Sequence, residues 1–282
     1  MRWFAVSDLH GRPNRYLSLF REVERNPPPA VLMGGDLLPR KGPVKEFMDE
    51  FLFRPIRSLR KSGIRTRFLV IMGNDDPKAH EHLFFQGDEE GVIDYIPMKT
   101  TKVHSFTVAG YPYIHPSPFL LKDWELYDVS RYVDPGCVSP PEGIHTTDQN
   151  TDELRFHTIK DDLDELARIS DPKRTIYLFH SPPFETNLDM ADIGSQKIDS
   201  VPLNPHIGSV AIKRFIEGHQ PPVTIHGHVH ESFHMTGRFH QRIKGTLAIS
   251  ACGTEKGLPL IEFDPEGIME PTRRILDRSS FP

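Results

Sequence analysis

Residues 3–10 read WFAVSDLH, four strand-type residues followed at once by Asp8 and His10. A short apolar run of this kind is typical of a strand that is buried on both faces of a sheet. The same order returns in residues 30–36, AVLMGGD, and in residues 68–76, FLVIMGNDD. The chain therefore repeats one arrangement, in which a buried strand ends in side chains that can bind a metal ion or a phosphate.

Two later runs extend this arrangement. Residues 175–179 lead directly to His180, and residues 223–225 lead to the segment HGHVH at 226–230. In open α/β sheets, ligands bind in the crevice outside the carboxyl ends of the strands. We therefore expect five strand ends, distant from one another in the chain, to converge on one site.

Helical periods separate the early strands. Residues 13–24 and 43–61 carry apolar side chains at helical spacing, with Pro55 as an expected kink, and residues 152–169 and 207–217 also predict helices. Alternation of strands and helices predicts a layered α/β fold.

Two regions have no clear period. Residues 111–150 are rich in proline, and we expect them to form a rim or lid. Residues 270–282, with three arginines, are expected to form a solvated tail.

The candidate metal ligands share carboxylate, amide or imidazole donors. They are Asp8, His10, Asp36, Asn74, His180, His228 and His230. This mixture suits Mn²⁺, Fe, Zn²⁺, Co²⁺ or Ni²⁺, whereas calcium and magnesium prefer oxygen alone and structural zinc usually recruits thiolates. Two such ions would bind phosphate oxygens and lower the pKa of a bridging water, whose hydroxide would attack phosphorus.

The spacing of these residues supports a common centre. In Asp8-Leu9-His10 and His228-Val229-His230, side chains two apart would point to the same side of an extended chain. Glycines stand beside three of the motifs, at Gly35, Gly73 and Gly227, where the absence of a Cβ lets backbone approach ions and substrate.

Taken together, these motifs form an ordered set that spans residues 8 to 230. The set is Asp8-x-His10, Gly35-Asp36, Gly73-Asn74-x-Asp76, His180 and Gly227-His228-x-His230. It resembles the signature of the calcineurin-like metallophosphoesterases. The stretches 206–209, HIGS, and 227–232, GHVHES, further resemble a poorly characterised prokaryotic branch of that superfamily.

The resemblance implies a fold and a division of the ligands. It implies one metallophosphoesterase domain over residues 1–282, built as a four-layer αββα sandwich of two facing mixed sheets flanked by helices. It also implies two divalent transition-metal ions, with manganese favoured. Asp8, His10 and His230 would hold the first ion and Asn74, His180 and His228 the second, while Asp36 would bridge them.

Asp75 is a departure from the family pattern. Many members place a histidine after the asparagine, where it is thought to protonate the leaving oxygen. An aspartate, with a reference pKa of about 3.9, donates a proton at neutral pH only where its surroundings raise that value. Our hypothesis is that Asp75 is catalytic by orienting a ligand or a water. The alternative is a loop carboxylate that caps the following helix near Lys78.

Fifteen histidines include further candidates. His206 is a candidate substrate-binding residue, together with Asn74, because it would open the helix near Ile207, where backbone N–H groups favour an anion. His226 is expected on its strand in a supporting role. His115 could line the site, but a proline-stiffened connection without substrate contact is the favoured interpretation.

Composition narrows the function. A net charge of −5 argues against nucleic acid as a substrate, so we expect a small-molecule or exposed phosphoester. A phosphodiesterase or phosphomonoesterase is favoured. The alternatives are a nuclease, a phosphoprotein phosphatase or a non-catalytic binding scaffold with the same fold.

The cellular setting follows from cysteine usage and hydropathy. Cys137 and Cys252 are distant in sequence and match no disulfide framework, which favours the cytoplasm. No apolar run approaches the roughly 20 residues of a membrane helix, so no membrane span is expected. The sequence specifies neither a protein partner nor an oligomeric state.

Overall fold

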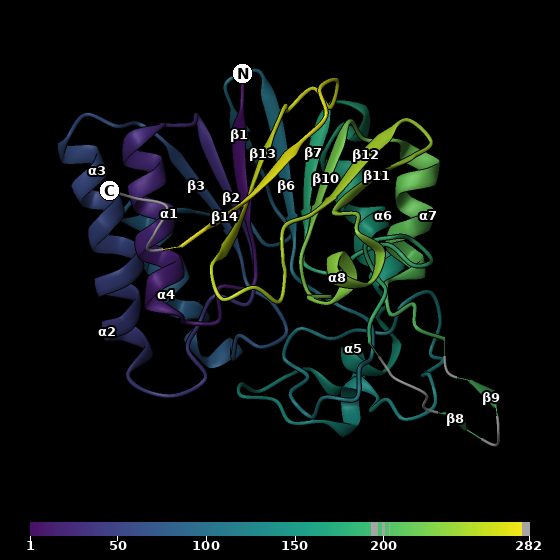
Figure 1. Ribbon diagram of the computed structural model, residues 1–282. Helices are drawn as coiled ribbons and strands as arrows, with labels where there is room; N and C mark the ends of the chain where they lie inside the picture. Colours follow the sequence, from purple (N-terminus) through teal and green to yellow (C-terminus); the bar gives the residue numbers. More distant parts are fainter. Residues whose placement is uncertain (193–196, 199–200, 203, 278–282) are drawn as a thin grey trace.

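Two six-stranded sheets form the centre of the protein, shown in Figure 1 as a computed structural model. The structure describes residues 1–192, 197–198, 201–202 and 204–277. The first sheet has the strand order β14-β13-β1-β2-β3-β4. Its strands are β1 (Trp3–Val6), β2 (Ala30–Gly34), β3 (Arg67–Ile71), β4 (Asp94–Tyr95), β13 (Leu258–Phe263) and β14 (Thr272–Leu276).

The second sheet has the strand order β11-β12-β10-β7-β6-β5. Its strands are β5 (Thr100–Val103), β6 (Phe106–Tyr111), β7 (Thr175–Phe179), β10 (Val223–His226), β11 (His240–Ile243) and β12 (Thr246–Ser250). A separate short pair joins β8 (Lys197–Ile198) and β9 (Val201–Pro202).

Each sheet has a parallel centre. In the first, β1 to β4 are parallel and β13 pairs antiparallel with β1. In the second, β6, β7, β10 and β12 are parallel, while β5 and β11 are antiparallel edge strands. Both sheets are therefore mixed. In each sheet, the carboxyl ends of the parallel strands lie on the same side of the sandwich.

Helices cover the outer face of each sheet (Figure 1). The first is covered by α1 (Pro13–Arg25), α2 (Val44–Met48), α3 (Arg54–Lys61) and α4 (Glu81–Glu89), and the second by α6 (Ile159–Ile169) and α7 (Val210–His219). The short helices α5 (Thr151–Phe156) and α8 (Ser232–Thr236) lie outside these layers. The fold is the expected four-layer αββα sandwich.

Strand alternation explains the layers. On β1, Trp3 and Ala5 face the second sheet, whereas Phe4 and Val6 pack under the helices, and all four are buried. Because both faces of the strand are covered, its sequence is continuously apolar instead of alternating. The same reason explains the other apolar runs of the sequence.

Two of the predicted helices are divided in the structure, and the one predicted over 207–217 is α7, which begins at Val210. Residues 43–61 divide into α2, a π-helical turn at Asp49–Phe53 and α3, with Pro55 in the first turn of α3. Residues 152–169 divide into α5 and α6, because Thr158 caps α6 in a capping box with Asp161. The described residues also contain 3₁₀ turns at Lys78–His80, Pro140–Glu142 and Pro172–Arg174.

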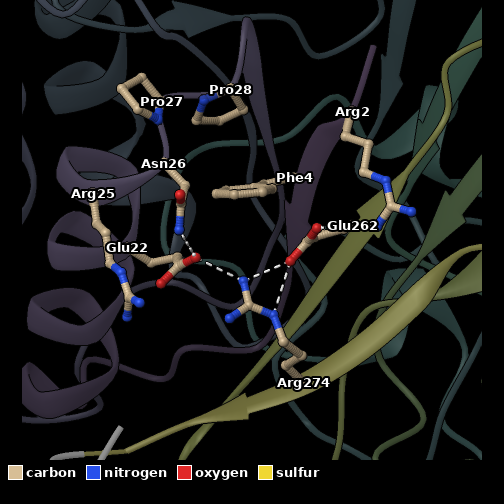
Figure 2. A pocket seen from close by; sticks show the side chains of 9 residues that line it. All are labelled: Arg2, Phe4, Glu22, Arg25, Asn26, Pro27, Pro28, Glu262 and Arg274. Carbon is tan, nitrogen blue, oxygen red and sulfur yellow. Dashed lines mark hydrogen bonds and ion pairs between the residues drawn. The ribbon is translucent and has the colours of Figure 1, made fainter. Parts of the chain in front are cut away.

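The prediction of a solvated tail after residue 270 is wrong for residues 272–276, which form β14. Figure 2 shows what holds this strand: Arg274 contacts Glu22 of α1 at 2.7 Å and Glu262 of β13 at 2.6 Å. Arg2 also contacts Glu262, at 3.3 Å. These contacts attach the edge of the sheet to α1. Arg278 lies outside the described residues.

Residues 111–150 lie at the end of the sandwich where the parallel strands terminate (Figure 1). A buried ion pair stabilises this segment: Nζ of Lys122 lies 2.5 Å from Glu125 and also donates to the carbonyl of Ser117. Trp124 Nε1 donates to the backbone oxygen of Asp76, and Asp123 accepts from the backbone N–H of Lys78. The segment therefore packs against the loop that follows β3.

Candidate metal centre

One group of four side chains gathers at the ends of β1, β2 and β10. Asp8, His10, Asp36 and His230 each offer a ligand atom, and these atoms all lie within 4.8 Å of one another. Nε2 of His230 is 2.9 Å from Oδ1 of Asp8 and 3.1 Å from Nε2 of His10. Converging carboxylate oxygens and imidazole nitrogens are a donor set for a divalent transition metal.

A second group lies beside the first. Nε2 of His180 is 3.0 Å from Oδ1 of Asn74, and the His180 ring is 5.4 Å from the ring of His228. Asp36 connects the groups, because its Oδ1 is 3.5 Å from Nε2 of His180 and its Oδ2 is 4.0 Å from Nε2 of His10. One carboxylate therefore directs an oxygen toward each group, and the structure brings all seven predicted ligands together.

The backbone at these positions is not extended, so the predicted reason for the convergence is wrong. Asp8, His10, Asp36 and His228 have φ values of 58°, 47°, 53° and 71°. A left-handed residue other than glycine costs about 1–2 kcal/mol, and such residues concentrate at functional sites. Within Asp8-Leu9-His10 and His228-Val229-His230, Leu9 and Val229 are buried among apolar or backbone neighbours, while Asp8, His10 and His230 approach one another.

Glycines permit this crowding. A Cβ on Gly73 would lie 2.4 Å from Oδ1 of Asp36 and 2.5 Å from Cε1 of His180. A Cβ on Gly227 would lie 2.1 Å from Oγ of Ser7 and 2.7 Å from Oδ2 of Asp8. A side chain at either glycine would therefore collide with the candidate ligands, whereas the predicted approach of backbone to ions and substrate stays a prediction.

The carboxylates remain charged although they are buried. Burial raises the pKa of Asp8. The charges of His230, His180 and His10 and the hydrogen bond with His230 together lower it by more, so the pKa lies well below its ordinary value. For Asp36, burial likewise raises the pKa, but the charge of His180, its hydrogen bond and the charge of His10 together outweigh burial and leave the pKa lowered. Ionised carboxylates are the form that binds a cation.

The histidines balance this negative charge. Burial lowers the pKa of His180, but the charge of Asp36 and its hydrogen bond raise it to about 9. His228 differs, because burial and then the charge of His180 lower its pKa to about 3. A cation at the centre would displace the proton of His180, so metal binding should release protons.

Asp75 lies on the outer side of His10. Its Oδ2 is 3.5 Å from Nδ1 of His10 and 2.6 Å from Nη2 of Arg40. Its backbone N–H donates to Asp36 at 2.8 Å. The predicted alternative, a cap near Lys78, does not occur among the described contacts, since Asp123 accepts from the Lys78 N–H.

Sequence reasoning assigned no role to three supporting side chains. Asp76 is buried, and its carboxylate accepts from the backbone N–H groups of residues 37, 38 and 73, which ties the loop after β2 to the loop after β3. Arg15 donates to the backbone oxygen of Asp8 at 2.6 Å and so connects α1 to the first ligand loop. Arg40, 75% exposed, holds Asp75. Asp76 belongs to the motif Gly73-Asn74-x-Asp76, whereas no local sequence pattern identifies Arg15 or Arg40.

The helix argument for His206 is wrong. The helix α7 begins at Val210, four residues later, and Asp128 accepts from the first N–H groups of α7. His206 instead donates from Nδ1 to Asp189 at 2.8 Å. His226 lies on β10 as predicted, with its ring nitrogens on Ser181 and Thr224.

The depression in Figure 2 is a separate feature. Its lining includes Arg2, Phe4 and Arg274, which lie at the beginning of β1 and on β14. The candidate ligands follow the other end of β1, so this depression is not part of the metal centre.

Comparison with known proteins agrees with the fold and the motifs. The family model of the calcineurin-like phosphoesterases matches residues 1–232. Among solved structures, TT1561 of Thermus thermophilus has a TM-score of 0.59 at 14% identity, over 97% of this chain and 98% of that one. A dimetal phosphatase from Danio rerio has a TM-score of 0.49 at 12% identity, over 98% and 99% of the two chains. Identities this low concern the fold alone.

Two further observations concern curated sequence relatives and membrane-spanning helices. No curated protein matches the chain in sequence. Among the described helices, none combines the length and apolar character needed to cross a membrane.

Proposed function

The chain belongs to the calcineurin-like phosphoesterase family and is a metal-dependent phosphoester hydrolase; from that premise we propose that its substrate is a small-molecule or exposed phosphodiester or phosphomonoester. Two divalent transition-metal ions, with manganese favoured, are part of the proposal. The observation that carries it is the placement of Asp36, which offers one carboxylate oxygen to each group of ligands.

We assign the ligands by these groups. Asp8, His10 and His230 would hold one ion, Asn74, His180 and His228 the other, and Asp36 would bridge them. When bound, such a pair of ions lowers the pKa of a water and stabilises charge on the phosphoryl group.

The protein's own side chains would then position the substrate. Asn74 directs its Oδ1 toward His180, which leaves the Nδ2 donor for a phosphoryl oxygen. Asp75 would orient His10, because a carboxylate on the second ring nitrogen fixes both tautomer and ring direction. His206 would contact the substrate from the rim.

The net charge argues against a nuclease, and the buried carboxylates argue against a binding scaffold. A net charge of −5 offers no general attraction for a nucleic-acid backbone, which disfavours a nuclease. A binding scaffold would have no chemical need for buried carboxylates in costly left-handed conformations. A phosphoprotein phosphatase shares the chemistry and would differ in the surface that receives the substrate.

Organisation and location remain part of the proposal. Residues 1–282 would form one domain, since the two sheets share a central core. Residues 111–150 would form its rim beside the loop after β3. The cytoplasmic location stays a prediction, supported by two free cysteines.

The test measures bound metal and turnover on the same preparation. We expect about two manganese ions per chain and hydrolysis of an activated aryl phosphoester, with the diester-to-monoester rate ratio defining the reaction class. Asp36→Ala should lose both metal and turnover. Asp49→Ala, which removes an exposed carboxylate paired with Arg54, should retain both. Bound metal without turnover on any phosphoester would favour the scaffold.

A further inference from the structure

An exposed guanidinium is joined to the candidate metal ligand His10 through Asp75. Oδ2 of Asp75 lies 3.5 Å from Nδ1 of His10 and 2.6 Å from Nη2 of Arg40. The Arg40 side chain is 75% exposed, and within the described part of the chain it makes no other hydrogen bond. A guanidinium has several N–H donors. Those on Nη1 and Nε of Arg40 therefore remain available to a molecule bound beside His10.

The position of Arg40 is set by contact between the loop after β1 and the loop after β2. Gly11 donates from its backbone N–H to the carbonyl of Leu37 at 2.9 Å. A Cβ on Gly11 would lie 2.3 Å from Cα of Pro39, so the two backbones touch. Gly11 directly follows His10, and Pro39 directly precedes Arg40. The backbone of Arg40 therefore lies beside the first ligand loop.

The same two loops carry two further cations. Arg12 follows Gly11 and Lys41 follows Arg40, and both are exposed. Neither forms an ion pair with any residue that the structure describes. Arg12 is also the N-cap of α1, whose first turn contains no acidic residue, so the positive end of the helix dipole adds to this charge. Arg12, Arg40 and Lys41, here called the basic edge, form a local positive surface on a chain with a net charge of −5.

The basic edge lies outside the group of candidate ligands. Asp75 and Arg40 are on the Nδ1 side of the His10 ring. The other ring nitrogen, Nε2, faces Asp8, Asp36 and His230. A phosphoryl group held among these ligands would be on the Nε2 side. A group that contacts Arg40 is therefore a second part of the bound molecule.

We propose that the basic edge binds a second anionic group of the substrate, a phosphate or a carboxylate on the same small molecule as the phosphoester that is cleaved. The proposal deepens the proposed function and rests on it. The planar fork of a guanidinium matches both kinds of oxyanion. Asp75 is a positioning residue here, because it holds Nη2 of Arg40 and leaves the remaining donors for the anion. A single extra anionic group needs only this local surface, which agrees with the acidic net charge.

The experiment compares esters that differ only in this second group. Phenyl phosphoesters would carry a hydroxymethyl, a carboxymethyl or a phosphonomethyl group at the meta position, each also with a longer alkyl spacer. We would measure kcat and KM at saturating manganese and take the ratio of kcat/KM between charged and neutral esters on one preparation. A general loss of activity cancels in this ratio.

The unmodified protein should favour the charged esters through a lower KM. In Arg40→Gln this preference should fall by about 10-fold, the lower end of the range for hydrogen bonds to charged groups. The loss should be in KM and not in kcat, because a remote group is held equally in the ground state and the transition state. A larger preference for the phosphonomethyl or for the carboxymethyl ester distinguishes a phosphate from a carboxylate.

Salt and charge variants separate ionic binding from loop structure. Higher ionic strength should reduce the preference of the unmodified protein, and it should reduce that of Arg40→Gln much less. Arg40→Lys should keep the salt dependence and lose part of the preference, since an ammonium lacks the planar fork. Arg12→Gln and Lys41→Gln should each lower the preference. Arg54→Gln is the matched control, because Arg54 is 69% exposed and also pairs with an aspartate, Asp49 at 3.0 Å. It should leave the preference unchanged.

Binding of unreactive analogues reads the same preference without turnover. Calorimetry would compare benzylphosphonate with its meta-phosphonomethyl derivative on the manganese-loaded protein. The derivative should bind more tightly to the unmodified protein, and Arg40→Gln should reduce that advantage.

Two results would overturn the anion site and leave the proposed function intact. One is hydrolysis by the unmodified protein with no preference for a charged ester at either spacer length. The other is a preference that is the same in Arg40→Gln as in the unmodified protein. If the manganese-loaded protein bound the analogues in an Arg40-dependent way but hydrolysed no ester, the proposed function would be wrong, and with it the assignment of the anion to a substrate.

Discussion

The carboxylate of Asp75 lies 3.5 Å from Nδ1 of His10, on the side of the ring opposite Nε2, which faces Asp8, Asp36 and His230. Arg40 holds the same carboxylate at 2.6 Å. A carboxylate in this position aligns the imidazole and increases its strength as a ligand. The departure from the family pattern at residue 75 therefore has a structural use that does not require a proton.

Asp75→Asn should weaken metal binding more than it slows the chemistry. The amide cannot hold the His10 ring as firmly, so we expect the manganese affinity to fall about 10- to 100-fold. At saturating manganese the rate should return to near that of the unmodified protein. Titration of activity against manganese checks this. A rate deficit that persisted at saturation would give Asp75 a direct part in the reaction.

Gly73→Ala should disrupt the centre sterically. The added methyl would meet Oδ1 of Asp36 at 2.4 Å, so the carboxylate must move away from one of its two ligand groups. We expect loss of bound metal and of turnover, measured by metal analysis and an aryl ester assay. Gly218→Ala is the matched control, because no atom lies within 4 Å of its Cβ position in α7. It should stabilise the helix by up to about 1 kcal/mol. Normal metal content in Gly73→Ala would show that the loop can relax.

Glu125→Gln should destabilise the rim. It leaves the ammonium of Lys122 buried without its ionic partner, which costs about 3–5 kcal/mol in such pairs. Urea denaturation measures the loss, and Lys122→Met combined with Glu125→Leu should recover much of it. Asp164→Asn, in an exposed ion pair with Lys160, should leave the unfolding midpoint unchanged. Equal midpoints for the single variant and the unmodified protein would contradict the prediction.

Glu22 should make part of the stability depend on pH. Burial raises its pKa most, but the hydrogen bonds from Arg274 and Asn26 and the charge of Arg274 together outweigh burial, so the folded pKa lies below the ordinary 4.5. Its contribution is therefore fully present above pH 4.5 and is lost as the pH falls through the folded pKa.

Glu22→Gln should cost about 1 kcal/mol at pH 7, a modest figure because Arg274 is 43% exposed. The difference in unfolding free energy between Glu22→Gln and the unmodified protein should decrease at acidic pH. Urea unfolding between pH 7 and pH 3 measures it, with the exposed Glu24→Gln as control. A difference that stayed constant with pH would exclude an ionic role for Glu22.

Local sequence patterns predicted the elements whose burial is continuous along a strand or follows the helical period. The strand β1 and the helix α1 occur where the apolar run and the helical period place them. The edge strand β14 was missed, because the adjacent Arg273 and Arg274 interrupt any apolar run. Their positions are explained only by pairing with β13 and by ion pairs with Glu255 and Glu22. The break before α6 had a local signal, Thr158 followed by Asp161, which is a capping pattern.

The sequence by itself determined the fold class and the kind of chemistry. Buried strands ending in Asp8, Asp36, His180 and His228 are local facts, and parallel strands bring their carboxyl ends to one edge. Only the tertiary structure decided how these side chains are used. It places Asp36 between His10 and His180 and directs Asp75 toward His10. It also joins His206 to Asp189 by a hydrogen bond. The reason is physical: propensity and periodicity act over neighbouring residues, whereas these contacts join distant segments through left-handed turns and packing that no local pattern encodes.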